Sequence, residues 1–388
     1  MWVRVVMLLA IGFGALGLAV PPRAESEREW RGSVAAEVRA FDGDTQGSLV
    51  AEPEFELRRS GKERFSVKLF GRLDSLDDER THFDLRELFW ERAGRSWELR
   101  AGVSKVFWGV TESQHLVDVI NQTDLVENPD GEDKLGQPMV KFTSIRNWGI
   151  VDVFLLPGFR ERTFPGIDGR LGGPLLIDTN LTNYESSAGD EHLDVAARWS
   201  HTFGVVDIGL AAFRGTNREP HLLPAAGLLA PFYDQIQQYS VDFQATVGDW
   251  LWKMESIRRR DSFETFSAVT AGLEYTFWGV SGSAIDIGVL AEYLWDERGR
   301  GAPTPFDDDW FVGSRLAFND TADTTILAGM VYDPASGALA GRVEARRRFG
   351  QDWIVEAEWR TFHGGDRFDA VAAIARDDHI LLSLQRHF

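Results

Sequence analysis

Apolar and polar residues alternate with a period of two along much of this 388-residue chain. In Trp97–Val103 the odd positions are apolar and the even positions are charged or small, and Leu193–Trp199 and Trp353–Arg360 repeat the pattern. Successive side chains of a β-strand point to opposite faces, so each segment predicts a strand with one apolar and one polar face. Helical spacing at i, i+3 and i+4 fits none of these segments. The chain is therefore expected to be all-β.

The connections between the alternating segments differ in length on alternate sides. Short turns with polar residues or glycine are predicted at 59–62, 93–96, 201–204, 247–249 and 349–352. Long irregular stretches occupy 108–136, 157–190, 215–234, 298–308 and 363–377. Short turns at one end and long loops at the other are typical of a transmembrane antiparallel up-and-down β-barrel, here of roughly 18 strands. The segment 79–92 fits least well, because Glu87 and Glu91 compete with the apolar register of Leu88 and Trp90.

A soluble β-sandwich also alternates, but its strands are shorter and one of its faces is simply free solvent. Here charges occupy the middle of adjacent strands, namely Arg342, Glu344 and Arg346 on one and Glu356, Glu358 and Arg360 on the next. Aromatic residues gather at segment ends, with Trp97, Trp250, Trp252, Trp278 and Trp353 near short turns and Phe107, Trp108, Tyr293, Trp295 and Trp310 beside long loops. Two interfacial aromatic girdles in a membrane barrel explain this placement, and core packing in a sandwich is the alternative.

Both ends of the chain carry features of an exported membrane protein. Residues 1–24 combine Arg4, an apolar run at 5–20 and a small residue before a candidate cleavage site, which predicts a secretory signal peptide. The alternative, an anchoring helix, needs about 20 apolar residues. Residues 25–388 then form a single barrel in the bacterial outer membrane, surrounded by lipid and lipopolysaccharide. The chain has no cysteine, so a closed sheet without free edges must hold it together.

The last strand ends on an aromatic residue. Ile380–Phe388 alternates up to Phe388 and resembles the assembly signal of bacterial outer-membrane proteins, which implies recognition by the barrel-assembly machinery. An even number of strands places both termini on the periplasmic side. Closure of the barrel requires this segment to pair with the first strand near Val34–Ala40.

If the apolar face meets lipid, the other face lines the interior of the barrel. Fourteen acidic and eleven basic residues fall on that face, which predicts a mixed wall with a mild preference for cations. The residues predicted to line a pore are Arg39, Glu56, Lys68, Arg72, Glu98, Arg100, Asp194, Arg198, Asp242, Lys253, Glu274, Arg315, Arg342, Glu344, Arg346, Glu356, Glu358 and Arg360. Opposite charges on neighbouring strands also pair. Most of these residues are therefore expected to brace the wall, and a minority to touch solute.

Residues 102–170 resemble a group of proteobacterial outer-membrane porin-like barrels. The resemblance rests on Gly102–Gly109, which ends in Trp-Gly, followed by Asp118-Val119-Ile120-Asn121 and Asp124-Leu125. In those families a strand ends in Trp-Gly and a short helical loop carries Asp-x-Ile-Asn, usually followed by Pro. This chain has Gln122 in place of that Pro, so the turn after Asn121 is expected to differ. The resemblance covers about one fifth of the chain and implies a channel without naming its solute.

The segment 112–121 carries Leu116, Val117 and Ile120 at helical spacing, which predicts a short helix. Such a helix either folds into the lumen as a constriction or caps the rim. The candidate constriction residues are Trp108, Asp118, Asn121 and Asp124, and the loops 108–136 and 157–190 are long enough to narrow or plug the lumen.

Other function classes find little support. The formal charge of −19 argues against nucleic acid as a partner, because phosphate binding needs a basic face. The eight histidines are scattered, no G-x-S-x-G sequence occurs, and no histidine pair has metal-ligand spacing beside a third donor, so neither catalysis nor a metal or other cofactor is expected. The acids at 307–309 and 127–133 lack the ligand order of a calcium-binding loop and are interpreted as solvated, although cation binding stays an alternative.

The expected function is a porin-like channel that passes small solutes through a polar lumen. A barrel that binds a partner through its loops, with a closed lumen, is one alternative. A transporter of apolar solutes is another, and it predicts an apolar pocket lined by the loop residues Leu222, Leu223, Leu228, Leu229 and Phe232.

Overall fold

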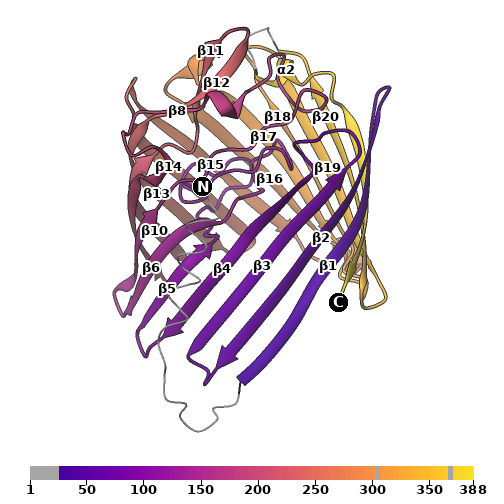
Figure 1. Cartoon of the computed structure of the whole chain (residues 1–388). Coiled ribbons are helices and arrows are strands. Elements are labelled where there is room, and N and C mark those ends of the chain that lie inside the picture. The colour runs from indigo at the N-terminus through magenta and orange to yellow at the C-terminus, as the bar shows by residue number, and fades with distance from the viewer. Residues whose placement is uncertain (1–25, 303, 305, 366–369) are drawn as a thin grey trace.

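The computed structural model describes residues 26–302, 304, 306–365 and 370–388. The predicted signal peptide, residues 1–24, lies outside them. Within the described part of the chain, 18 antiparallel strands form one sheet in which each strand pairs with the next, and the first also pairs with the last (Figure 1). The predicted closed up-and-down barrel and its strand number are confirmed.

The first half of the barrel consists of β1 (Ser26–Phe41), β2 (Thr45–Arg59), β3 (Glu63–Asp74), β4 (His82–Ala93), β5 (Trp97–Ser104), β6 (Gln137–Arg146), β7 (Gly149–Pro157), β9 (Leu193–Phe203) and β10 (Val206–Thr216). The second half consists of β13 (Gln235–Val247), β14 (Trp250–Arg260), β15 (Thr265–Phe277), β16 (Asp286–Asp296), β17 (Asp308–Ala317), β18 (Thr325–Tyr332), β19 (Leu339–Phe349), β20 (Trp353–His363) and β21 (His379–His387).

The remaining elements lie in the connections. A three-stranded sheet contains β8 (Asn183–Tyr184), β11 (His221–Ala225) and β12 (Leu228–Tyr233). The short helices are η1 (Thr179–Leu181), η2 (Gly189–Glu191), η3 (Val280–Gly282), η4 (Gly299–Gly301) and α2 (Ala370–Ala373). None of the helices in the described residues is long and apolar enough to cross a membrane.

The first and last strands pair with each other, as predicted, and close the barrel. Val38 lies opposite Leu382, and Ala40 lies opposite Ile380. Gly32 and Phe388 exchange two backbone hydrogen bonds, of 3.0 and 3.1 Å. The last residue of the chain is therefore part of the seam, and both β1 and β21 are paired on each side.

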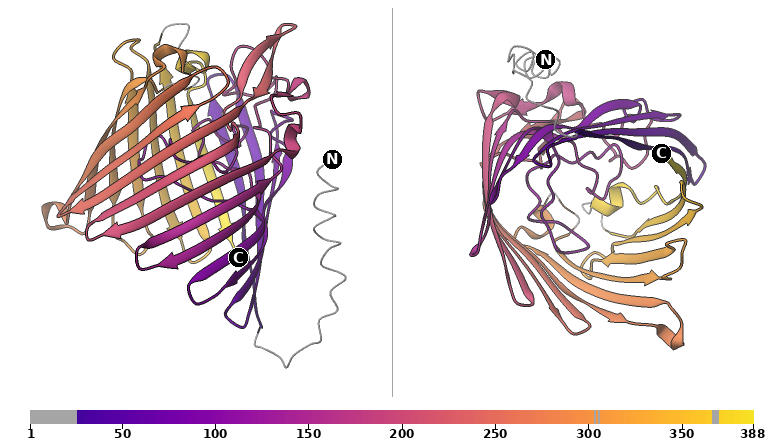
Figure 2. Two further views of the ribbon diagram at one scale, coloured as in Figure 1. Left: turned by 90° about the vertical axis from the view of Figure 1, so that its left-hand side faces the viewer. Right: turned by 90° about the horizontal axis from the view of Figure 1, so that it is seen from below.

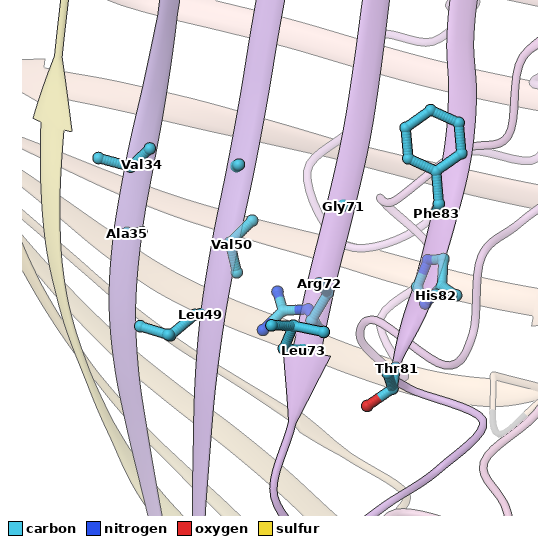
Figure 3. Close-up of a pocket in the computed structure, with 11 residues that line it drawn as sticks. Val34, Ala35, Leu49, Val50, Gly71, Arg72, Leu73, Thr81, His82 and Phe83 are labelled. Atoms are coloured by element: carbon cyan, nitrogen blue, oxygen red, sulfur yellow. The ribbon is translucent and has the colours of Figure 1, made fainter.

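The apolar faces of the strands point outward. On β1, Val34 and Val38 are 47% and 48% exposed, whereas Arg39 is only 4% exposed. This is the reverse of a water-soluble sheet and leaves a surface suited to lipid. Figure 3 shows one part of it, a shallow groove of about 650 Å³ over β1–β4 with Val34, Leu49, Leu73 and Phe83 around it.

Most of the predicted girdle residues are on the outside as well. The exposed fractions of Trp97, Trp250, Trp252, Trp278, Trp295, Trp310 and Trp353 lie between 37% and 66%. The prediction that Trp108 belongs to an outer girdle is wrong, because its side chain is 4% exposed and packs inside the barrel against Phe154 of β7.

The connections follow the predicted asymmetry. Those at one end, the turn end, are two to eight residues long, while those at the other, the loop end, reach 35 residues at 158–192 (Figure 1). All five predicted long stretches lie at the loop end. The turn expected at 201–204 lies at 204–205 instead, because β9 continues to Phe203.

A β-bulge explains why the segment 79–92 fits the alternation of apolar and polar residues least well. Lys68 of β3 pairs with Glu87, but the next residue, Leu69, pairs with Leu85. The extra residue, Arg86, shifts the register, so Phe83 and Leu85 face outward before the bulge and Leu88 and Trp90 face outward after it.

Candidate functional site

Residues 105–136, between β5 and β6, run through the interior of the barrel and are called the lumen loop. Figure 2 shows this segment within the ring of strands when the barrel is viewed along its axis. The helix predicted at 112–121 is wrong, because no helix occurs within 105–136. Its apolar residues Val117, Val119 and Ile120 are nevertheless fully buried, in a cluster with residues of the wall.

Glu255 of β14 holds one arm of the lumen loop. Its Oε1 accepts hydrogen bonds from the backbone N–H groups of Val110 (2.7 Å) and Thr111 (3.0 Å), and its Oε2 accepts one from Val117 (3.1 Å). A carboxylate can satisfy several backbone N–H groups at once, including those that an irregular segment leaves without backbone partners. The loop approaches this closely at Gly109, where a Cβ atom would lie 3.1 Å from Glu255 Oε1 and 2.9 Å from His115 Nδ1.

Glu292 of β16 binds the same arm in the same way. Its two carboxylate oxygens accept hydrogen bonds from the backbone N–H groups of Glu112 (2.8 Å) and Ser113 (2.9 Å). The side chain of Glu112 in turn pairs with Arg315 of β17 at 2.9 Å and lies 3.7 Å from Lys253 of β14. This arm therefore reaches the wall formed by β14 to β17.

The other arm, 122–136, is held by arginines of the opposite part of the wall. Arg72 of β3 pairs with Glu127 at 2.7 Å, and Arg360 of β20 pairs with Asp130 at 2.6 Å. Arg39 of β1 donates to the Asn128 side chain at 3.0 Å. The interpretation of 127–133 as solvated acids is thus wrong for Glu127 and Asp130, because these two acids find guanidinium partners inside the barrel.

The four candidate constriction residues all hold the lumen loop in shape. Asn121 accepts from Val106 N (2.8 Å) and donates to the carbonyl oxygens of Ser104 and Leu135. Asp118 pairs with Lys134 at 3.3 Å, and Asp124 pairs with Arg86 at 2.6 Å. Trp108 packs in the buried cluster of the loop. Each of the four side chains is at most 4% exposed, whereas Glu112 and Glu132 keep 22% and 59% of their side-chain surface exposed.

Burial and neighbouring charges shift the pKa values of several groups in the lumen loop. Burial lowers the pKa of His115, but the Glu255 carboxylate, 3.8 Å from its Nδ1, outweighs this effect and raises the pKa. Burial raises the pKa of Asp118. Burial, together with the charges of Asp130 and Glu127, raises the pKa of Asp133 to about 6. The loop therefore changes its charge between mildly acidic and neutral pH.

Residues 158–192, between β7 and β9, are called the mouth loop, and they extend over the lumen loop at the loop end. Thr163 donates a hydrogen bond to Asp124 at 2.5 Å, and Arg160 pairs with Asp84 of β4 at 2.6 Å. Farther along, Arg170 pairs with Asp44 (2.6 Å) and Asp377 (2.8 Å), which lie in the connections next to the β1–β21 seam. The loop therefore spans from β7 to the far side of the barrel mouth.

The other predicted pore-lining residues lie on the inner face and form pairs. The closest pairs, with N–O distances of 2.5 to 2.6 Å, are Arg198–Asp242, Arg218–Asp194, Arg100–Glu91 and Arg342–Glu358. Three further pairs have N–O distances of 2.8 to 3.1 Å, namely Arg342–Glu344, Lys68–Glu52 and Arg346–Glu356. The longest N–O distances are 3.8 Å for Lys253–Glu274 and 3.9 Å for Arg100–Glu98. Glu56 pairs with Arg58. Arg315 (46%), Arg346 (38%) and Glu356 (38%) keep the most exposed side chains of the predicted set. Contact with solute stays a prediction for all of them.

Sequence reasoning missed the arginines that bind the loops. Arg80, in the β3–β4 connection, donates to the carbonyl oxygens of Val126 and Glu127 at 2.5 Å, and Arg218 donates to that of Ile120 at 3.1 Å. Both precede or follow strands in loops, where alternation gives no signal. Among the described acids, Asp307, Asp309 and Asp333 lie together, but Asp309 and Asp333 already accept hydrogen bonds from backbone N–H groups.

A scan of family models and a search of curated proteins found no match. Solved structures do match over almost the whole chain. OccD3 (OpdP) of Pseudomonas aeruginosa is 9% identical with a TM-score of 0.55, covering 95% of this chain and 94% of its own. The chain has the fold of an outer-membrane porin. A BenF-like porin from Pseudomonas fluorescens Pf-5 is 9% identical with a TM-score of 0.55, and the match covers 94% of this chain and 98% of the porin. OccK5 (OpdH) of P. aeruginosa is 12% identical with a TM-score of 0.54, and the match covers 94% of this chain and 97% of OccK5. At these identities the likeness concerns the fold alone.

Proposed function

We propose that this protein is a channel of the bacterial outer membrane that passes small solutes through a polar, mixed-charge lumen. The lumen loop and the mouth loop narrow the path. The outward apolar band of the barrel supports insertion into a lipid bilayer, and the barrel size suits a water-filled interior, since porins with 16–18 strands leave an aqueous channel. The porin fold shared with the solved structures supports the same proposal.

The observation that carries the proposal is the way in which the lumen loop is suspended. One arm is bound by Glu255 and Glu292, and the other by Arg72 and Arg360, so the loop bridges opposite parts of the wall. If the loop only plugged the barrel, the inner face of the wall beside it would not need exposed charged side chains. Here Arg315, Arg346 and Glu356 keep between 38% and 46% of their side-chain surface exposed on the inner face.

The charges next to the lumen loop suggest where solute passes. Glu112 and Glu132 lie on the loop, and Lys253, Arg315 and Arg342 face them from the wall. A solute that passes between the loop and the wall would meet acids on one side and bases on the other. This arrangement favours small polar or zwitterionic solutes over apolar ones at that depth.

The orientation in the membrane is part of the proposal. β1 begins and β21 ends at the turn end of the barrel. With short turns in the periplasm and long loops outside the cell, β1 starts and β21 finishes on the periplasmic side. Lipid and lipopolysaccharide then surround the apolar band, and the strand that ends in Phe388 is available to the assembly machinery during folding.

Conductance across a planar bilayer tests the channel. Purified protein is expected to give stepwise ion currents. A protein that inserts, as judged by resistance to protease, but gives no current would refute the channel and favour a closed barrel that binds a partner through its loops.

A further inference from the structure

A cavity at the loop end lies directly above the lumen loop. Its volume is about 830 Å³, within the range of small-molecule binding sites. Leu125 and Pro129 of the lumen loop contribute to its lining. The other lining residues come from the mouth loop, the β10–β13 connection and the connections before β17, β19 and β21. Figure 1 shows β8, β11, β12 and α2 gathered at this end of the barrel.

The lining of the cavity is mainly apolar, although it is built from loops outside the lipid-facing band. The mouth loop contributes Phe164, Ile167 and Leu175, and β11 contributes Leu222 and Leu223. Ile167 is 80% exposed, and the leucines at 175, 222 and 223 are 39% to 46% exposed. Loops that face water normally carry polar residues, so apolar side chains that converge on one cavity mark a binding site. Of the five residues expected to line an apolar pocket, Leu222, Leu223 and Leu229 line this cavity, and Leu228 and Phe232 do not.

One polar group in the cavity has unused binding capacity. Arg162 lines the cavity, and its Nε donates to Gln122 at 3.3 Å. Its two terminal amino groups make no hydrogen bond and no ion pair with any of the described residues. Burial lowers the pKa of this guanidinium, and the charge of the nearby Glu219 offsets the effect only in part.

The acids of the cavity are already engaged. Glu219 pairs with Arg259 of β14 at 2.5 Å, and Asp333 accepts hydrogen bonds from Ala335 N and Ser336 N. Because these acids are satisfied and Arg162 is not, the free polar function of the cavity is a donor. It would pair with an oxygen acceptor of a bound molecule.

We propose that this cavity binds a small amphipathic solute, with an apolar body against Leu175, Leu222 and Leu223 and a carbonyl or carboxylate oxygen on Arg162. In the channel proposed above, on which this role rests, the cavity is the entry site. A solute held there lies on Leu125 and Pro129, next to the lumen loop that it must pass.

Equilibrium binding to the full-length mature barrel in lipid nanodiscs tests the proposal, with empty nanodiscs subtracted. The probes are cyclohexyl methyl ketone, cyclohexanecarboxylate, ethylcyclohexane and cyclohexylmethylammonium. The first two are expected to bind saturably, the hydrocarbon several-fold more weakly, and the ammonium ion weakest of all. The double variant Leu175→Asn/Leu222→Asn should weaken ketone binding at least tenfold, and Leu181→Asn, an exposed leucine of the same loop outside the cavity, should not.

The variant Arg162→Met separates the two halves of the site. It is expected to bind the ketone and the hydrocarbon equally well, because the apolar lining is retained and the donor is lost. Arg258→Met removes an exposed arginine that pairs with Glu297 away from the cavity, and it should leave the discrimination intact.

No saturable binding, or binding that both sets of variants leave unchanged, would overturn the cavity proposal. Conductance of the same preparation keeps the two proposals apart. Current without probe binding leaves the channel standing and removes the entry site, whereas probe binding without current leaves a binding site and removes the channel.

Discussion

The carboxylate of Glu255 on β14 binds both the backbone N–H group and the hydroxyl group of Thr111, which precedes it by 144 positions. A residue in the wall thereby fixes a loop from which it is separated in the chain by five barrel strands, β6, β7, β9, β10 and β13. The position of the lumen loop depends on this contact more than on the loop's own conformational preferences.

Glu255→Ala should release the first arm of the lumen loop. Each hydrogen bond to a charged group contributes about 1.5–3 kcal/mol, and at least three to backbone N–H groups are lost together. We expect single-channel currents that are noisier than those of the wild type. The barrel itself should stay folded, as judged by its heat-dependent mobility on a gel. Glu255→Gln keeps an acceptor and should have a smaller effect, and Glu264→Ala, at an exposed strand connection, should have none. Quiet wild-type-like currents from Glu255→Ala would contradict the anchoring role.

The current noise should depend on pH through His115. The pKa of His115 is raised above its ordinary value of 6.5 by Glu255, so its protonated form is favoured in the folded loop. This stabilisation is fully present below pH 6.5 and is lost as the pH rises through the raised value. Noise should therefore increase with pH in wild type, and His115→Asn should remove that dependence. If the dependence survives the substitution, it belongs to the loop acids whose pKa values are also raised, Asp118, Glu132 and Asp133.

Charge substitutions on the inner face should change ion selectivity in opposite directions. Arg346→Gln is expected to shift the reversal potential in a salt gradient toward cation selectivity, and Glu356→Gln toward anion selectivity, because both side chains are exposed on the inner face. Arg347→Gln is the matched control. Arg347 is the next residue on β19, pairs with Asp320 at the turn end and does not face the lumen. A shift in Arg347→Gln equal to that in Arg346→Gln would show that the effect comes from overall charge.

A disulfide should form across the barrel seam. Val38 and Leu382 are directly opposite on β1 and β21, where Cα atoms are about 4.5–5.5 Å apart in an antiparallel pair. The chain has no cysteine, so Val38→Cys/Leu382→Cys gives a clean test on a non-reducing gel. The pair Val38→Cys/Leu384→Cys is offset by two positions and should cross-link poorly. Equal yields from the two pairs would contradict this register.

The strand pattern could be predicted because each strand is amphipathic by itself. Alternation needs only the local order of residues, and the position of a strand in a closed antiparallel sheet follows from its neighbours in the chain. The seam between Ile380–Phe388 and Val34–Ala40 followed for the same reason, because a closed barrel leaves the two end strands no other partner. The bulge at Arg86 was not predicted, since it depends on how β4 fits against β3.

The course of the lumen loop was beyond local reasoning. Leu116, Val117 and Ile120 have helical spacing, yet the segment is irregular. Glu255 and Glu292 accept hydrogen bonds from the backbone N–H groups of 110–113 and of Val117, which hold this course in place. The carboxylates lie more than 130 positions away in the chain, so only the tertiary structure could bring them to the loop.

The sequence by itself determined the architecture: the inward charges, the outward apolar face, the strand number and the uneven connections, all of which are properties of short segments. The tertiary structure alone decided what the interior contains. Arg162 and Leu222 meet in one cavity, and Arg360 meets Asp130, because the loops fold over and into a barrel whose closed wall brings distant segments within hydrogen-bond reach.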